Sequence, residues 1–317
     1  TWLLLEQSPE AVWDPLGSSA PLAFVFSPLV GSPLTTSAKF AVVARSPLTG
    51  RINDSLASSH FALSGKRTGH DALLITGRAE TPTTLVIEPG GVRFESAESL
   101  WGRSSRDTSG RVRDEFGKHL HVAAIGPSGE RQVHFATISH DARHAGRGGL
   151  GAVMGSKQLK ALAVGGDCQV EFADPARLVS LSRDLSARSF GPATAKYREL
   201  GTVSNLLTFN RLGALPTRNF QGGVFEGAEA LAPDALAADR GRTRTSCAAC
   251  TIGCEHIFPL EGSEDGVRME YENLFALGPL CGVADPATVL KASARCDELG
   301  LDTISTGATV AFAMECA

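Results

Sequence analysis

Short apolar runs alternate with clusters of Gly, Pro and Ser through the first half of the chain. Runs of this kind, bounded by turn residues, predict β-strands. Residues 1–168 are therefore predicted to form a β-rich domain. The runs are PLAFVFSPL (21–29), AKFAVVARS (38–46), DALLITGRA (71–79), TTLVIEPGGVRF (83–94), HVAAIGPSG (121–129) and KALAVGG (160–166).

A helical period replaces this pattern after Asp167. Asp174 followed by Pro175 is a typical helix start, because the aspartate caps the first turn and proline suits the first helical position. The leucines that follow share one face of the predicted helix, at positions 178, 181 and 185. Residues 169–317 are therefore predicted to form a mostly helical domain, and the fold class is α+β.

A later helix is predicted to begin at Asp285-Pro286 and to end at Gly300. Asp297 then lies in the last turn, against the negative end of the helix dipole, and Asp302 lies just beyond the end. Two carboxylates around a helix C-terminus suggest a bound group that offers hydrogen-bond donors. Two solvated acids near a turn explain these residues equally well.

Composition places the chain among globular proteins. Its 317 residues allow about two domains, and 43% of them are hydrophobic and 20% charged. The net charge of −4 gives no basic footprint for nucleic acid or for an acidic membrane. No apolar run approaches the roughly 20 residues that a membrane span needs.

Three of the seven cysteines lie in CAACTIGC, at Cys247, Cys250 and Cys254. An odd number of cysteines, three of them clustered, favours metal ligands over disulfides and predicts a reducing cytoplasm. One loop with this spacing can supply three thiolates to a [4Fe–4S] cluster. Zinc is the main alternative, although a second C-x-x-C hook is absent.

A glycine-rich stretch covers residues 141–164, DARHAGRGGLGAVMGSKQLKALAV. It lacks the Gly-Lys-Ser/Thr order of a phosphate loop and the G-x-G-x-x-G spacing of a dinucleotide fingerprint. Glycines of this density indicate either a nearby phosphate or tight backbone packing.

RMEYENLFALGPLCGV (268–283) places Glu270 and Glu272 in apolar surroundings shortly after the cysteines. A carboxyl group in such surroundings has a raised pKa and can exchange protons near neutral pH. Taken alone, either residue is more simply explained as a surface acid.

Together these stretches resemble the tungsten-containing aldehyde:ferredoxin oxidoreductase family, over essentially the whole chain. The matching motifs stand in the family's order and spacing: SPLTG (46–50), AGRGGLGAVMGSKQLKALAV (145–164), GALPTRNF (213–220), CAACTIGC (247–254) and DELGLDTISTG (297–307).

The resemblance implies an enzyme that oxidises aldehydes to carboxylic acids. Its members hold tungsten, or in some branches molybdenum, between two pterin cofactors, with Mg²⁺ bridging the pterin phosphates. A [4Fe–4S] cluster then passes electrons to ferredoxin. Relatives that share this cofactor core reduce an aromatic ring bound to coenzyme A, and the sequence does not separate the two reactions.

The resemblance also implies roles for particular residues. Cys247, Cys250 and Cys254 match three cluster ligands, and Glu272 matches an acid near the metal that transfers a proton. The residues matching cofactor contacts are Arg143, His144 and Gly146 near the phosphates and magnesium, Asp297, Leu301 and Asp302 in a D-x-x-x-L-D turn at the pterin ring, and Lys39 and Leu56.

The sequence departs from the family in three respects. Lys39 stands where Arg is usual, which loses a bidentate fork, and Leu56 stands where Asn is common. The chain also begins without Met and matches about half of a usual member. We therefore expect that the first strands and a third helical domain are missing and that the fourth cluster ligand lies beyond residue 317. The isolated piece is expected to have low or no activity, and an inactive truncated fragment is the alternative to an enzyme. The oligomeric state stays open, a homo-oligomer included.

Overall fold

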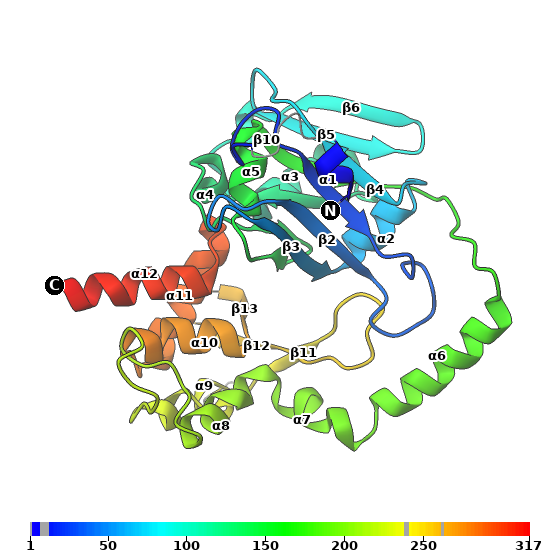
Figure 1. The fold of residues 1–317 in the computed structure, drawn as a ribbon. Helices are drawn as coiled ribbons and strands as arrows, with labels where there is room; N and C mark the ends of the chain where they lie inside the picture. The colour runs from blue at the N-terminus through cyan, green and yellow to red at the C-terminus, as the bar shows by residue number, and fades with distance from the viewer. Residues whose placement is uncertain (1, 7–12, 238–240, 261–262) are drawn as a thin grey trace. The chain divides into compact units, whose positions relative to one another are not determined.

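The computed structural model describes residues 2–6, 13–237, 241–260 and 263–317 (Figure 1). The chain divides into two compact units. Unit 1 consists of Thr1–Arg183 and Glu298–Asp302, and unit 2 consists of Asp184–Asp297 and Thr303–Ala317.

Unit 1 contains a four-stranded antiparallel sheet in the order β3-β2-β1-β4. Along β2, Phe40, Val42 and Ala44 are buried, and the residues between them, starting with Lys39, face the other side. Ala41 pairs with Leu56, so Leu56 lies on the same open face as Lys39. The strands are β1 (Leu22–Phe26), β2 (Lys39–Arg45), β3 (Ile52–Ser58) and β4 (Ala72–Ile75).

A second sheet in unit 1 has six strands in the order β6-β5-β10-β7-β8-β9, with only β5 and β10 parallel. Every residue of β10 is buried, because both faces of this sheet are covered. The strands are β5 (Thr83–Glu88), β6 (Gly91–Ser96), β7 (His121–Ile125), β8 (Ile138–His140), β9 (Arg143–Ala145) and β10 (Leu159–Val164).

The main core of unit 1 lies where the two sheets meet α2 and α5. Leu162 and Val164 of β10 enter this core, whereas Ala161 and Ala163 face a second core beneath α3. The helices are α1 (Trp2–Glu6), α2 (His60–Lys66), α3 (Ser105–Phe116), α4 (Pro127–Glu130), α5 (Leu150–Ser156) and the first part of α6 (Pro175–Ser189).

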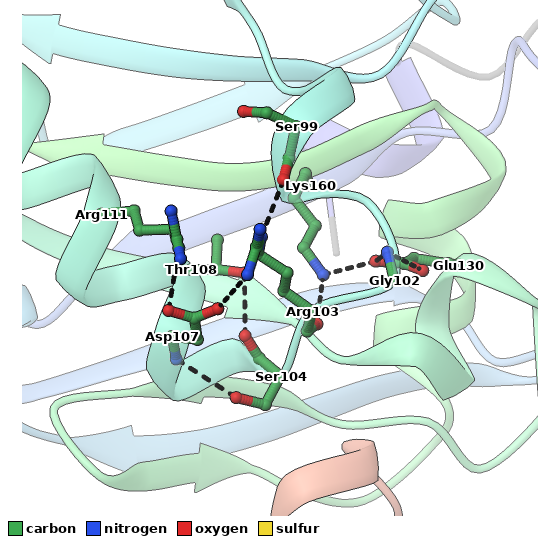
Figure 2. A network of polar contacts seen from close by, with 9 residues as sticks. All are labelled: Ser99, Gly102, Arg103, Ser104, Asp107, Thr108, Arg111, Glu130 and Lys160. Carbon is green, nitrogen blue, oxygen red and sulfur yellow. Dashed lines mark hydrogen bonds and ion pairs between the residues drawn. The ribbon is translucent and has the colours of Figure 1, made fainter.

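A buried ion pair fastens the start of α3 to the six-stranded sheet (Figure 2). Lys160 on β10 donates to the carbonyls of Arg103 and Ile125, both at 2.8 Å, and to the carboxylate of Glu130. That carboxylate also accepts from the Gly102 N–H. The side chains of Lys160 and Glu130 are 0% and 5% exposed, so both charges depend on each other and on these hydrogen bonds.

Unit 2 is mostly helical and also contains a three-stranded antiparallel sheet in the order β11-β12-β13. Its strands are β11 (Thr243–Thr245), β12 (Glu255–Leu260) and β13 (Ser263–Met269). Its helices are α7 (Pro192–Leu200), α8 (Asn205–Arg211), α9 (Pro233–Ala237), α10 (Tyr271–Leu277), α11 (Pro286–Leu299) and α12 (Thr303–Cys316). No helix in the described ranges is long and apolar enough to cross a membrane.

The α+β class, with a β-rich first half followed by a helical region, is confirmed, and each of the six apolar runs contains a strand. The helices expected at Pro175 and Pro286 begin there, and Gly300, at φ 77°, follows the last residue of α11. The sequence analysis predicted a mostly helical second half but did not identify the β11-β12-β13 sheet within it. The leucines at 181 and 185 of α6 are exposed.

One short segment near the end of the chain belongs to unit 1 rather than to unit 2. Glu298–Asp302 belongs to unit 1 by its contacts, although the residues on either side belong to unit 2. The Thr137 N–H donates to the Gly300 carbonyl at 2.9 Å, and the Asp302 N–H donates to the Phe135 carbonyl at 3.0 Å. The segment is therefore held by backbone bonds against the residues that directly precede β8.

Candidate cofactor site

The glycine-rich loop before α5 is fixed to strand β3 through the backbone of Arg147. The Arg147 N–H donates to Ser55 Oγ at 3.3 Å, and Asn53 Nδ2 donates to the Arg147 carbonyl at 3.3 Å. A Cβ atom on Gly148, at φ 92°, would come within 2.3 Å of the Asn53 side chain. A glycine is therefore required for the loop to approach β3 this closely.

Most glycines of this stretch serve backbone packing. A Cβ atom on Gly149, Gly151 or Gly155 would lie within 2.4 Å of a carbonyl oxygen of another segment. Gly146 differs, because the nearest atom to its Cβ position is His144 Cβ at 3.9 Å. Of the two sequence interpretations, packing accounts for three of these positions, and open space for a ligand remains at Gly146.

Lys157, at the end of the stretch, is not available as a phosphate ligand. Its buried ammonium donates to the carbonyls of Ser18 at 3.2 Å and Gly77 at 3.1 Å. Burial, with a smaller effect from Arg78, lowers the pKa of Lys157 to about 8. The structure thus agrees with the rejection of a nucleotidase-type phosphate loop.

The D-x-x-x-L-D turn meets the glycine-rich loop directly. Arg147 Nη1 donates to Asp302 Oδ2 at 2.8 Å. Asp302 is buried, and Leu301 is half-buried and bridges to Ala136. Asp297 lies in the last turn of α11 and is half-buried. Unit 1 therefore joins Asp302 to the loop that contains Gly146.

Arg143 and His144 lie on β9, directly after a tight turn. Asp141 and Ala142 both have positive φ, 46° and 57°, which short hairpin turns require. Burial disfavours the Asp141 carboxylate, but hydrogen bonds from His121 and the Phe61 N–H outweigh it and hold the pKa of Asp141 below its usual range. The hydrogen bonds of Asp141 therefore fix the turn from which β9 begins.

The remaining cofactor-contact candidates of unit 1 lie on strands β2, β3 and β9. His144 Nδ1 lies 2.9 Å from Ser139 Oγ, its cross-strand neighbour on β8. Lys39 is half-buried, and Leu56, on the same sheet face, is 63% exposed. A leucine side chain has no oxygen atom, so only the backbone carbonyl of Leu56 could act as a ligand to a magnesium ion.

In unit 2, the three cysteines form one loop that leads into β12. Cys250 N–H donates to the Cys247 carbonyl at 3.2 Å, and the loop turns through positive φ at Ala249 and Gly253. Thr251 Oγ1 lies 2.6 Å from Ser189 Oγ at the end of α6. All three cysteines are half-buried free thiols.

The loop has the donor set for an iron–sulfur cluster. Burial raises the pKa of Cys254, and the nearby charges of Glu270, Cys247 and Cys250 raise it further. Three thiolates so close together need a cationic partner, which a cluster supplies. Within the described ranges no group of three or more His, Cys, Asp or Glu side chains is arranged to hold a metal ion.

Helix α10 carries the two glutamates. Glu270 is the N-cap and forms a reciprocal capping box with Asn273, which explains a carboxylate at that position. Glu272 follows in the first turn. The Glu272 residue is exposed, but neighbouring protein atoms partly desolvate its carboxyl group. This desolvation, together with the negative charge of Glu270, raises the pKa of Glu272. Glu272 is therefore close in sequence to Glu270, whose charge raises the pKa of Cys254.

The comparisons with known proteins cover both units. The family described as "Aldehyde ferredoxin oxidoreductase, N-terminal domain" matches residues 1–166, and "Aldehyde ferredoxin oxidoreductase, domains 2 & 3" matches residues 183–317. The chain belongs to the aldehyde ferredoxin oxidoreductase family. The resemblance inferred from the motifs is therefore confirmed.

Individual relatives agree with this family. The chain is 40% identical to the tungsten-containing aldehyde ferredoxin oxidoreductase of Thermococcus kodakarensis and 38% identical to that of Pyrococcus furiosus, over 99% of its length. It spans about half the length of these relatives, 52% in both cases. A solved structure, the active site complex BamBC of benzoyl coenzyme A reductase with 1,5 dienoyl-CoA, matches 99% of this chain and 50% of that chain with a TM-score of 0.86 and 25% identity.

Sequence reasoning missed the residues that hold the site together. Arg147 was quoted within the glycine-rich motif without a role, and Asn53 and Ser55 were not singled out. A single charged residue among five glycines was a usable signal for Arg147, since its side chain has to serve something other than loop flexibility. No local signal connects it with Asp302, 155 residues away.

Proposed function

We propose that the protein oxidises aldehydes to carboxylic acids at a tungsten bis-pterin centre and passes the electrons through a [4Fe–4S] cluster to ferredoxin. One observation supports this most strongly: 38–40% identity to tungsten-containing aldehyde ferredoxin oxidoreductases across 99% of the chain. A cytoplasmic location is part of the proposal, since all seven cysteines are free thiols.

The two regions would divide the work. Residues 1–168 form the base for the pterins, and residues 169–317 carry the cluster loop and the D-x-x-x-L-D turn. Asp297 and Asp302 would accept hydrogen bonds from a pterin ring, with Leu301 between them. The phosphates and their Mg²⁺ would meet Lys39, Arg143, His144, Gly146 and the backbone of Leu56.

The metal centre supplies the Lewis-acid and redox chemistry of such an oxidation when it is bound. The contribution of this chain is to bind, orient and exchange a proton. Asp302 is fixed by the bond from its N–H to Phe135 and by its ion pair with Arg147. The pKa of Glu272 is raised above its ordinary value, which makes its carboxylate a stronger base. Cys247, Cys250 and Cys254 would hold three corners of the cluster.

The proposal is tested by purifying the full-length protein and assaying it with a set of aldehydes and a viologen acceptor, with tungsten, molybdenum and iron measured by mass spectrometry. We expect aldehyde-dependent reduction, with tungsten and four irons per chain for the proposed centres. An absence of both pterin and aldehyde turnover in metal-loaded protein would contradict the proposal.

A second candidate reaction is reduction of an aromatic coenzyme A thioester. The TM-score of 0.86 to the benzoyl coenzyme A reductase complex supports it. The identity to that structure is 25%, against 40% to the Thermococcus kodakarensis enzyme, and this difference favours aldehydes. Turnover of aromatic thioesters but of no aldehyde would reverse the order of the two candidates.

Glu272→Gln should lower kcat by about a hundredfold or more, the usual contribution of a positioned general base. A base works only when deprotonated, and the pKa of Glu272 is raised above its ordinary value of 4.5. Wild-type activity should therefore fall as the pH drops through that raised pKa, and the variant should lose this acidic limb.

Glu115→Gln, an exposed residue on α3, is the matched control and should leave both kcat and the pH profile unchanged. If Glu272→Gln keeps the acidic limb of the profile, Glu272 is not the base.

A further inference from the structure

Two side chains far apart in sequence, Arg147 and Asp302, form an ion pair within unit 1. The Nη1–Oδ2 distance is 2.8 Å. Asp302 is 6% exposed, whereas Arg147 is 55% exposed. The guanidinium group thus donates from Nη1 to the buried Asp302 and keeps other donors at the surface, because arginine carries five N–H groups. Apart from its ion pair with Asp302, the Arg147 side chain has no role in the function proposed above.

The Arg147 backbone does not move freely. Ser55 Oγ accepts its N–H and Asn53 Nδ2 donates to its carbonyl, both at 3.3 Å. Both partners lie on β3, in the middle of the register that pairs β3 with β2. The side chain therefore starts from a fixed point on the sheet, and its direction is defined by that anchor.

Asp302 is held just as firmly from the other side. Its N–H donates to the Phe135 carbonyl at 3.0 Å, and the preceding Leu301 bridges to Ala136. A Cβ atom on Gly126 would lie 2.4 Å from the Leu299 carbonyl oxygen, so the turn is packed tightly at its start. The Arg147–Asp302 ion pair therefore joins two segments that are each held by their own backbone bonds.

We infer that Arg147 is a positioning residue that couples the phosphate end of the cofactor site to its ring end. This inference depends on the proposed function, because it assumes that a pterin occupies the site. A carboxylate can accept several hydrogen bonds, so one group can serve both the Arg147 guanidinium and the N–H groups of a planar amino-pyrimidine ring. The pair orients the Asp302 carboxylate and ties it to the loop beside Gly146, so that one rigid element grips both ends of the cofactor.

Charge and geometry distinguish this role from simple stapling of the turn. The turn already has the Gly300 and Asp302 backbone bonds, which do not involve the Arg147 side chain. Loss of the guanidinium should therefore change ligand binding more than folding. A lysine ammonium can replace the one hydrogen bond that Arg147 donates to Asp302, although it could not replace a bidentate pair of hydrogen bonds.

The test uses the full-length protein and measures how fast bound pterin is lost, by the fluorescence of oxidised pterin in the protein fraction after gel filtration. Arg147→Gln and Asp302→Asn should each speed this loss by about ten- to a hundredfold, the value of a charge-assisted hydrogen bond. Arg147→Lys should restore most of the retention. The double variant should be no worse than the poorer single variant, because both act through one contact.

Arg111→Gln is the matched control, since it removes an exposed arginine paired with Asp107 at 2.9 Å on α3, and it should retain pterin as the wild type does. Protein made in a host without pterin synthesis provides the folding readout, and Arg147→Gln should not lower its melting temperature beyond the control.

Three results would overturn the inference. They are normal pterin retention in Arg147→Gln, additive losses in the double variant, or a melting temperature that falls equally with and without pterin. If the wild-type protein binds no pterin, the proposed function fails as well. If the wild type binds pterin and Arg147→Gln binds it equally, only the inference about Arg147 fails.

Discussion

Replacing Cys250 with Ser in the full-length protein is expected to abolish the electron paramagnetic resonance signal of the reduced cluster and to remove most of its iron. A serine hydroxyl is not ionised at neutral pH and is a poor substitute for a thiolate ligand. Cys250 lies in the middle of the loop, and its N–H closes the turn onto the Cys247 carbonyl at 3.2 Å. Cys250→Ser would therefore remove the middle one of the three expected cluster ligands.

The control for this experiment is Cys168→Ser. Cys168 is also a half-buried free thiol, but it lies in unit 1, outside the cysteine loop. Its variant should keep both signal and iron. An unchanged spectrum in Cys250→Ser would contradict the ligand assignment. Zinc without iron in the wild-type protein would instead support the zinc interpretation of the cysteine loop.

Lys160→Met is expected to lower the free energy of unfolding of unit 1 by about 3–5 kcal/mol, as other broken buried ion pairs do. The substitution leaves the Glu130 carboxylate, 5% exposed, without its cation. It also removes the donor to two carbonyls, those of Arg103 and Ile125. The Gly102 N–H alone cannot compensate a buried negative charge.

Urea unfolding followed by tryptophan fluorescence measures this effect selectively, because the three tryptophans, at positions 2, 13 and 101, all lie in unit 1. Lys118→Met, which removes an exposed pair with Asp114, should change stability by less than about 1 kcal/mol. Lys160→Met/Glu130→Gln should recover part of the loss, since no unpaired charge remains. A loss below about 1 kcal/mol in Lys160→Met would show that Lys160 and Glu130 are not a structural pair.

Local patterns predicted those elements whose signals are contained in a few neighbouring residues. The strands of unit 1 with apolar cores, and the helices that open at Asp-Pro, were of this kind. Strand β3 was missed because INDSLAS is polar on both faces: its open face carries Asp54, and Ser55 on the other face serves the Arg147 loop. Strands β8 and β9 have three residues each, too few for a periodic signal.

The site shows the same division. The cysteine triad was visible because its members lie within eight residues. The carboxylates of Asp297 and Asp302 could be singled out because the helix dipole disfavours negative charge at the end of α11. The structure shows that Asp302 is held by hydrogen bonds to Phe135 and Arg147. The Arg147 contact was invisible because it forms only when segments 155 positions apart come together. The roles of Glu272, Lys39 and Leu56 stay predictions, and the Glu272→Gln experiment addresses the first of them.

The return of Glu298–Asp302 to unit 1 has a consequence for biosynthesis. During translation, the first 183 residues leave the ribosome well before this segment, and all of Asp184–Asp297 must be synthesised in between. A nascent unit 1 can fold early, as domains generally do, yet its Arg147 has no carboxylate to receive it until residue 302 emerges. The Arg147–Asp302 ion pair is therefore a late contact of unit 1, formed only after the intervening residues have left the ribosome.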